Sequence, residues 1–276
     1  MTRDHRTYWL LVLPALVLML VFYIYPLLDV FRLSFTEPVI GLHNYQELVD
    51  RSLLHRIFWT TLKVCVITTI ITVVFGYVLA YAMTIVGSKQ RTWMMFCVLL
   101  TFWLSVLVRA FARVMLLRDE GIVNQTLLSI GIIDQPIHLV RNLFGVIVGM
   151  AHYMLPLAVL PLYSNLTGID TRYVDAARGL GASPLKAFWW VYFPMSKPGV
   201  LAAAILVFIF SLGFFITPAI LGGGKVVMVS EYIRVSFEET LRWGQATMLA
   251  STLLVSVVIA LVLIGRFVDL RKVFSS

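Results

Sequence analysis

Six long apolar stretches constrain the fold of this chain more than any other feature of its sequence. A helix needs about 20 apolar residues to cross the hydrocarbon core of a bilayer, because every backbone N–H and C=O must find a partner within the segment. Stretches of this length, or close to it, occupy residues 8–28, 64–86, 93–117, 143–166, 200–221 and 246–267. The sequence therefore predicts an all-α, polytopic membrane protein whose residues 1–276 form one domain with six transmembrane helices.

The composition agrees with a surface that largely faces lipid. Hydrophobic residues make up 60% of the chain and charged residues only 13%, whereas a soluble domain carries about 25% charged residues. The net charge of +8 does not indicate nucleic-acid binding, because the basic residues stand singly between apolar runs rather than in a patch. Cys65 and Cys97 lie inside apolar stretches and are interpreted as core residues, not as a disulfide or a metal site.

The first apolar stretch is interpreted as a retained transmembrane helix rather than a signal peptide. Arg3 and Arg6 precede it, but it has spanning length and closes on the bulky residues 22–26 instead of a small-residue cleavage site. An even number of spans puts both termini on one side. Lysines and arginines divide evenly between the two sides, and the tightest turn, residues 87–91, is basic, so we expect both termini in the cytoplasm.

The loop between the fourth and fifth stretches, about residues 170–195, is predicted to form two short helices joined by a tight turn; we call it the elbow. Asp170 or Thr171 can cap the first helix, and Gly179 and Gly181 supply a permissive backbone for the turn. The segment is too polar to cross lipid and too regular to be a slack linker. It therefore indicates a docking surface on the cytoplasmic side.

The second helix of the elbow has a start signal and a predicted end. Ser183 followed by Pro184 is a cap followed by proline at the first helical position. Pro194 and Pro198 are expected to end this helix before the next span begins, because proline lacks the N–H that a helix interior needs.

Several spaced positions of the elbow form one pattern: Asp175-Ala176-Ala177, then Gly181, then Val191 before Phe193-Pro194. This order resembles the EAA loop of bacterial ABC-importer permeases, with Asp for Glu, Val for Ile and Phe for Leu. In that family the loop is a coupling helix that sits in a cleft of the ATPase subunit. The resemblance implies that the ATPase contact is made or shaped by Asp175, Ala176, Ala177, Gly179, Gly181 and Pro194. The alternative is an ordinary amphipathic elbow at the membrane interface.

Segments outside the elbow extend the resemblance. They are His43-Asn44-Tyr45 and residues 118–124 and 214–224. Together with the six spans they resemble the spermidine/putrescine branch of these permeases. The resemblance implies the type I ABC importer permease architecture, a multi-pass location in the bacterial inner membrane, and a polyamine as the leading substrate. Opines, amino acids, iron chelates and aminophosphonates are the alternatives.

The same resemblance implies partners that this chain does not contain. They are a second permease subunit, expected to be a paralogue in a heterodimer, two ABC ATPase subunits that bind ATP and Mg, and a periplasmic substrate-binding protein, with lipid around the spans. Gly224-Lys225 is not a phosphate loop, because Ala219 and Val226 stand where that loop requires a glycine and a Ser or Thr. We expect no cofactor, metal or catalytic residue in this chain.

Other functional classes find less support in the sequence. A secondary carrier would be expected to show an internal repeat and acidic residues deep in its spans, and an intramembrane enzyme would be expected to carry HExxH or GxSxG. None of these features is present in the 276 residues. A simple channel would not need the elbow. The sequence therefore predicts a transport subunit rather than an enzyme.

Candidate residues of a translocation path are the polar or bulky groups in or near the spans. Phe214 and Phe215 stand just before Pro218, where a bend is expected, and their rings either close the path or simply fill a helix bundle. His152 is either a path residue or a core histidine. Glu231 in the last outer loop either attracts a cation, binds the delivery protein or is solvated.

Two arginines make the third stretch the least regular one. Arg109 and Arg113 share a helix face at a spacing of four. Near an outer boundary such side chains usually extend to the lipid headgroups. A place in the path is the alternative, and it favours an anionic substrate and fits a polyamine poorly. Gly145 and Gly149 in the fourth stretch form a GxxxG pair, which permits close helix contact.

Overall fold

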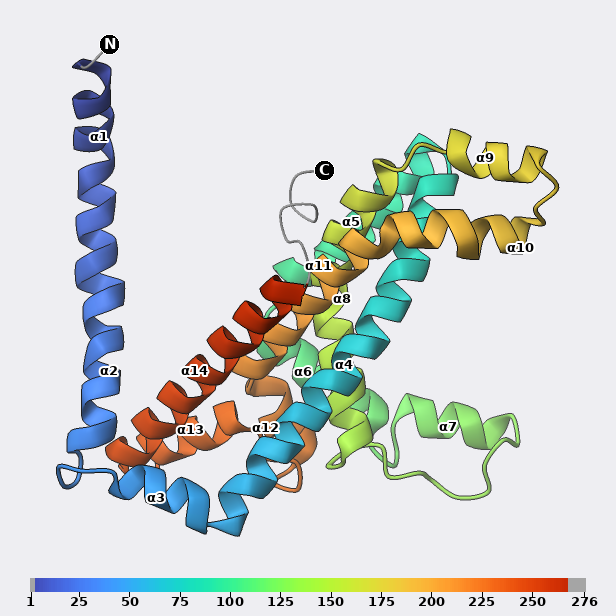
Figure 1. The fold of residues 1–276 in the computed structure, drawn as a ribbon. Helices are drawn as coiled ribbons and strands as arrows, with labels where there is room; N and C mark the ends of the chain where they lie inside the picture. Colours follow the sequence, from blue (N-terminus) through green and yellow to red (C-terminus); the bar gives the residue numbers. More distant parts are fainter. Residues whose placement is uncertain (1–2, 268–276) are drawn as a thin grey trace. The chain divides into compact units, whose positions relative to one another are not determined.

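The computed structural model describes residues 3–267, and within them every regular element is helical (Figure 1). Contacts divide the chain into two compact units, one of Met1–Arg56 and Tyr232–Ala260, and the other of Ile57–Glu231 and Leu261–Ser276. We describe each unit separately as the first and the second unit. The absence of strands from the described part agrees with the predicted all-α class.

The first unit begins with one long helix. It consists of α1 (Arg3–Met19), a π-helical segment (Leu20–Ile24) and α2 (Tyr25–Thr36). Pro26 explains the π-helical turn: proline clashes with the carbonyl four residues earlier, and here the N–H of Tyr25 bonds instead to the carbonyl of Leu20, five residues back. The helix continues past residue 28, where the apolar stretch was expected to end.

A short helix, α3 (His43–Asp50), follows the first span and is tied to its end. The buried Asn44 side chain donates to the carbonyls of Ser34 at 3.0 Å and Glu37 at 2.6 Å. Tyr45 stacks on Phe35 with ring centroids 4.9 Å apart. The His-Asn-Tyr segment noted in the sequence therefore holds the loop after the first span in place.

The second unit is built around α8 (Leu143–Thr167), which buries residues along much of its length. It packs most extensively against α11 (Phe193–Gly213) and also contacts α5 (Ser88–Trp103). The core between them is apolar and includes Met154, Ala158, Leu162, Ala203 and Val207. The long α4 (Ser52–Ile85) contributes Ala80 to the same core.

The third predicted span is not one continuous helix. α5 ends at Trp103, two non-helical residues follow, and α6 (Val106–Leu117) starts in a new direction. The broken pair formed by residues 88–103 and 106–129 bends by 102°, and its last part includes α7 (Ile122–Ser129). α6, the helix after the break, buries Arg109 and Arg113.

The expected end of the second elbow helix is wrong. α10 (Pro184–Ala187), a π-helical segment (Phe188–Tyr192) and α11 form one helix that runs through Pro194 and Pro198. The N–H of Phe193 bonds to the carbonyl of Phe188, five residues back, so the π-helical turn absorbs the strain that Pro194 would otherwise impose. The fifth span therefore begins in the elbow itself, well before residue 200.

Four further helices lie in the described part of the chain. α9 (Arg172–Gly179) lies in the elbow, α12 (Ile216–Gly222) follows the fifth span, and α13 (Val229–Glu238) precedes α14 (Trp243–Phe267). Within residues 3–267, five helices can cross a membrane by length and composition, or six if the bent pair counts as one span. This confirms the polytopic membrane class.

Candidate functional site

The elbow consists of α9 and α10, which lie against each other at one end of the second unit (Figure 1). Its first helix starts at an acidic clamp rather than at the side chain of Thr171, which makes no capping bond. The carboxylate of Asp170 accepts from the backbone N–H of Arg172 at 3.0 Å and from its Nη2 at 2.6 Å. These bonds lower the pKa of Asp170, and the side-chain bond raises the pKa of Arg172.

The turn of the elbow depends on one of its two glycines. Gly181 has a φ of +91°, which a residue with a side chain rarely adopts, and its N–H bonds to the carbonyl of Arg178 at 3.0 Å. Gly179 is the last residue of α9 and does not have a positive φ. Ser183 accepts from the backbone N–H of Lys186 at 3.4 Å and Pro184 is the first helical residue, which confirms the predicted start of α10.

The tip of the elbow is exposed and partly apolar. Asp175, Ala176, Gly179 and Gly181 are all exposed, and Ala177 is half-buried. Leu180 is 91% exposed, and Leu185 and Trp190 are also exposed. Exposed apolar residues on a polar helical surface are typical of a contact site for another protein.

Aromatic side chains join the elbow to the core of the second unit. Tyr81 of α4 contacts the ring of Tyr192 with centroids 5.3 Å apart and that of Phe188 at 5.6 Å. The hydroxyls of Tyr77 and Ser196 lie 3.0 Å apart. α10, the π-helical segment and α11 form one continuous helix, Pro184–Gly213, so the elbow and the fifth span share a helix.

The fifth span ends at the first candidate gate residue. Phe214 follows α11 in extended backbone, and its ring stacks on that of Tyr153 with centroids 4.4 Å apart. Ser230 donates its hydroxyl to the Phe214 carbonyl at 3.1 Å. Phe215 is half-buried and directly precedes α12, in which Pro218 is buried. The expected bend before Pro218 is thus a complete break in the helix.

Both arginines of α6 are buried. Arg109 and Arg113 are each 7% exposed, so neither extends away from the protein as expected for a headgroup contact. The Cζ atom of Arg109 lies 4.6 Å from the centroid of the Tyr153 ring, and Nη2 of Arg113 lies 3.0 Å from Nδ1 of His152. Arg109, Arg113, His152 and Phe214 are therefore brought together around Tyr153.

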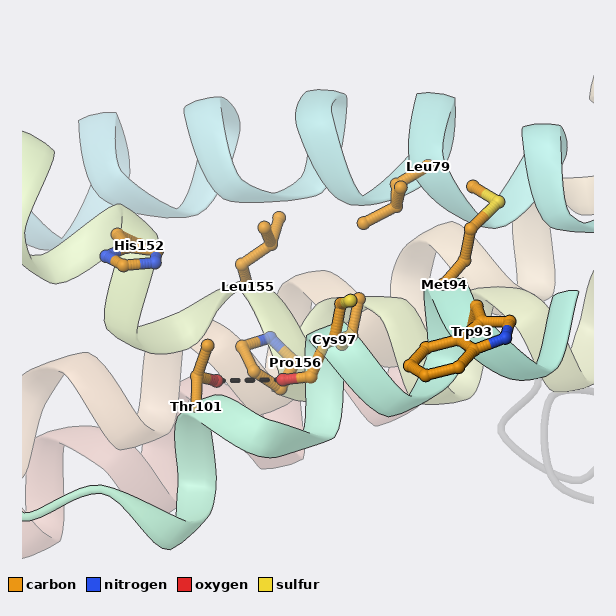
Figure 2. A pocket seen from close by; sticks show the side chains of 9 residues that line it. Leu79, Trp93, Met94, Cys97, Thr101, His152, Leu155 and Pro156 are labelled. Atoms are coloured by element: carbon orange, nitrogen blue, oxygen red, sulfur yellow. Dashed lines mark hydrogen bonds between the residues drawn. The ribbon is translucent and has the colours of Figure 1, made fainter. Parts of the chain in front are cut away.

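His152 lies on α8, next to Tyr153. Its side chain is exposed in this chain and lies at one end of a pocket of about 370 Å³ between α4, α5 and α8. Figure 2 shows His152 at one end of this pocket and Trp93 at the other, with Leu155 and Cys97 between them. The remaining lining is almost entirely apolar, so the imidazole is the polar end of an apolar groove.

Glu231 is buried in the first turn of α13, with 8% of its surface exposed. Of the three alternatives that the sequence left open for Glu231, the solvated side chain is therefore excluded. The sequence reasoning gave no role to Tyr153, whose position directly after His152 was the available signal, or to Thr217. No group of three or more His, Cys, Asp or Glu residues in the described part is arranged to hold a metal ion.

Comparison with known proteins extends over most of the chain. The family model described as "Binding-protein-dependent transport system inner membrane component" matches residues 72–271. The spermidine/putrescine transport system permease protein PotB of Haemophilus influenzae is 34% identical over 222 residues, which cover 80% of this chain and 77% of the relative. PotB of Escherichia coli is 32% identical over 228 residues, which cover 82% of each chain.

Solved structures have the same fold. A bacterial ABC transporter involved in the import of the acidic polysaccharide alginate matches with a TM-score of 0.74 at 20% identity, and 96% of each chain is covered. The same kind of transporter in complex with its alginate pentasaccharide-bound periplasmic protein matches with a TM-score of 0.75. At this level of identity the likeness concerns the fold.

Proposed function

This chain belongs to the family of binding-protein-dependent transport system inner membrane components, and from that premise we propose that it forms part of the import path for a polyamine. It is a permease subunit of an ABC importer and a multi-pass inner-membrane protein, a transport component rather than an enzyme. The observation that carries the polyamine proposal is the identity of 34% and 32% to two spermidine/putrescine permeases over about four fifths of the chain.

The elbow is proposed to bind a separate ATPase subunit and to move when that subunit hydrolyses ATP. Its tip, with Asp175, Ala176 and Ala177 on α9, would sit in a cleft of a separate ATPase subunit, which binds ATP and Mg. The exposed Leu180 and the tight turn at Gly181 support this role, because both suit a convex surface that enters a groove. Since the elbow faces the ATPase, both termini would lie in the cytoplasm.

The path residues are proposed to respond to the elbow through the fifth span. A continuous helix connects Pro184 with Gly213, and the stacked pair of Phe214 and Tyr153 lies at its far end. Movement of this helix would separate the two rings and open the path. The full importer would contain a paralogous second permease, two ATPase subunits and a periplasmic binding protein.

The assembly is tested by purifying the tagged chain in mild detergent and identifying the proteins that co-purify, for wild type and for Gly181→Asp. We expect an ABC ATPase and a second permease with wild type, and loss of the ATPase in the variant. Recovery of an intact membrane complex without any ATPase would contradict coupling through the elbow and would favour a secondary carrier.

The substrate is tested by uptake of radiolabelled spermidine and putrescine into proteoliposomes that hold the complete importer, with its binding protein added outside. ATP-dependent uptake is expected. A second candidate, a small amine that also carries an acidic group, is favoured by the two buried arginines, since paired guanidinium groups repel a polycation. Uptake of an opine or an aminophosphonate without uptake of spermidine would select this second candidate.

A further inference from the structure

Helix α6 places two positive charges on its buried face. This face consists of Arg109, Ala110, Arg113 and Leu117, and both arginines are more than nine-tenths buried. Arginines inside a membrane protein normally pair with an anion or with backbone carbonyls, because an unpaired charge is costly to bury. The surroundings of these two side chains therefore require an explanation.

Several hydrogen-bonding groups of the cluster lack a partner. Nε and Nη1 of Arg109, Nε of Arg113 and Oγ1 of Thr217 are buried and make no hydrogen bond. The stacking of Arg109 on Tyr153 leaves its N–H groups unused, and Arg113 uses only Nη2, toward His152. A guanidinium group has five N–H donors and no acceptor, so the arginine nitrogens can be satisfied only by acceptors, whereas the Thr217 hydroxyl can donate or accept.

Close helix packing assembles the cluster. Gly149 of α8 lies where α6 and α12 meet: a Cβ there would be 2.6 Å from Cγ2 of Thr217 and 3.8 Å from Cδ of Arg113. Three helices thus bring two guanidinium groups and a hydroxyl together, and the Nδ1 atom of His152 accepts from Arg113 and so orients it. Guanidinium and hydroxyl donors are the groups that recognise a carboxylate or phosphonate.

The charge along α6 also favours an anion. Toward its C-terminal end, a pocket of about 590 Å³ is lined by Val114, Arg118, Arg141 and Lys225. Two acidic residues share this pocket, and one of them, Asp119, is paired with His138 at 2.8 Å. The three basic groups thus outnumber the two carboxylates of this pocket, and the resulting positive charge attracts anions toward the helix that carries the arginines.

We propose that Arg109, Arg113, His152 and Thr217 form a binding site for an oxyanion of the carboxylate or phosphonate type. The proposal rests on the chain being an importer permease. The oxyanion has two sources: an acidic group on the imported solute, or a carboxylate of the companion permease subunit. Only the first source excludes a polyamine, which has no acidic group.

The test uses the complete importer complex purified in detergent, and the melting temperature is followed by tryptophan fluorescence. The probes are 2-aminoethylphosphonate and glutamate, with chloride at equal ionic strength as the control. The variants are Arg109→Gln, Arg113→Gln and the charge-conserving Arg113→Lys. Arg32→Gln is the matched control, because that side chain is 69% exposed and paired with Asp29.

If the solute supplies the oxyanion, a probe raises the melting temperature of wild type, and the half-maximal concentration rises about tenfold or more in the glutamine variants, as expected when hydrogen bonds to a charged group are lost. If a carboxylate of the companion permease subunit supplies the oxyanion, the probes do not change the melting temperature. The two glutamine variants of this chain then no longer co-purify with the companion subunit, while each variant chain by itself melts at the temperature of the wild-type chain by itself. Arg32→Gln changes neither result.

The proposal is overturned if the probes leave wild type unchanged and both glutamine variants keep the companion. If the glutamine variants do not fold, two other measurements test the proposal: the effect of the probes on the wild-type melting temperature, and the amount of companion subunit that co-purifies with Arg113→Lys. Lysine keeps the positive charge but lacks the planar guanidinium group that binds an oxyanion through two hydrogen bonds. Spermidine uptake by the wild-type importer is measured separately, so the polyamine proposal can fail while this site stands.

Discussion

Gly149 leaves no room for a side chain where α8 meets α12. A Cβ at this position would lie 2.5 Å from Cδ1 of Leu221 and 2.6 Å from Cγ2 of Thr217, and both of those residues are fully buried. The GxxxG pair in the sequence therefore marks a real close approach on the side of Gly149. The contact positions α12, and with it the short segment that carries Phe214.

We predict that Gly149→Ala lowers the stability of the permease by about 1–3 kcal/mol, because overpacking displaces Leu221 and Thr217. The measurement is the melting temperature of the purified complex. Gly213→Ala is the control, since a Cβ there meets nothing within 4 Å. Equal melting temperatures for the two variants would show that the α8–α12 contact is less tight than described.

Asp170 gives the elbow a dependence on pH. Its hydrogen bonds with Arg172 lower its pKa below the ordinary value of 3.8. A lowered carboxyl pKa means that the stabilisation is complete above the ordinary pKa and is lost as the pH falls through the lowered one.

We predict that hydrogen exchange at the start of α9, corrected for the intrinsic effect of pH, accelerates as the pH falls below 3.8 in wild type. In Asp170→Asn the corrected exchange should be fast and independent of pH over the same range, because the neutral amide forms no ion pair. A wild-type profile that stays flat to pH 2 would exclude the clamp.

At the scale of elements, the two glycines of the elbow turn have different roles. Only Gly181 adopts a positive φ, whereas Gly179 ends α9 with room for a side chain. The sequence could not separate them, because the backbone angles depend on where α9 ends, and helix ends are poorly specified by sequence.

We predict that Gly181→Ala strains the turn by about 1–2 kcal/mol, the cost of a left-handed conformation for a residue with a Cβ. Transport per ATP hydrolysed should fall in reconstituted importer, because the elbow tip changes shape. Gly179→Ala is the matched control and should transport as wild type does. A defect of equal size in both variants would mean that the turn needs flexibility rather than a positive φ.

The π-helical segments explain why two proline signals behaved differently from expectation. In the first and the fifth spans, a π-helical turn ends two residues before the proline, at Ile24 and at Tyr192, and the helix continues through the proline. Proline ends a helix only when the carbonyl four residues earlier cannot be moved aside. Packing around residues 188–192 supplies that adjustment, and no local sequence rule predicts it.

At the scale of the whole molecule, the exposed tip of the elbow implies a partner. Leu180 is the most exposed large hydrophobic residue of the described chain, at 91%. An apolar side chain that becomes buried in a partner contributes about 1.5–3 kcal/mol to binding.

We predict that Leu180→Glu weakens binding of the ATPase to the purified permease by about tenfold or more, with an unchanged permease melting temperature, because the side chain makes few contacts within the chain. Ile132→Glu, at a residue 66% exposed after α7, is the matched control and should bind the ATPase normally. Binding is measured by titrating labelled permease with ATPase; an unaffected Leu180→Glu variant would remove the tip from the interface.

The sequence by itself determined the membrane class, the elbow and the family. These follow from local properties: the length of apolar runs, capping residues such as Ser183-Pro184, and a spaced pattern around Asp175 and Gly181. The site residues of the elbow and of the path stay predictions until the variants above are measured.

Only the tertiary structure decided whether the two arginines of the third span are buried in the protein or face the lipid headgroups. The sequence placed Arg109 and Arg113 on one helix face, but that face could equally have met lipid headgroups. In the structure this face follows the 102° bend after Trp103 and is buried near His152, Tyr153 and Thr217, which lie up to about a hundred residues away in the chain. Contacts between residues so distant in the chain arise from packing, because helical periodicity specifies a face and not its neighbour.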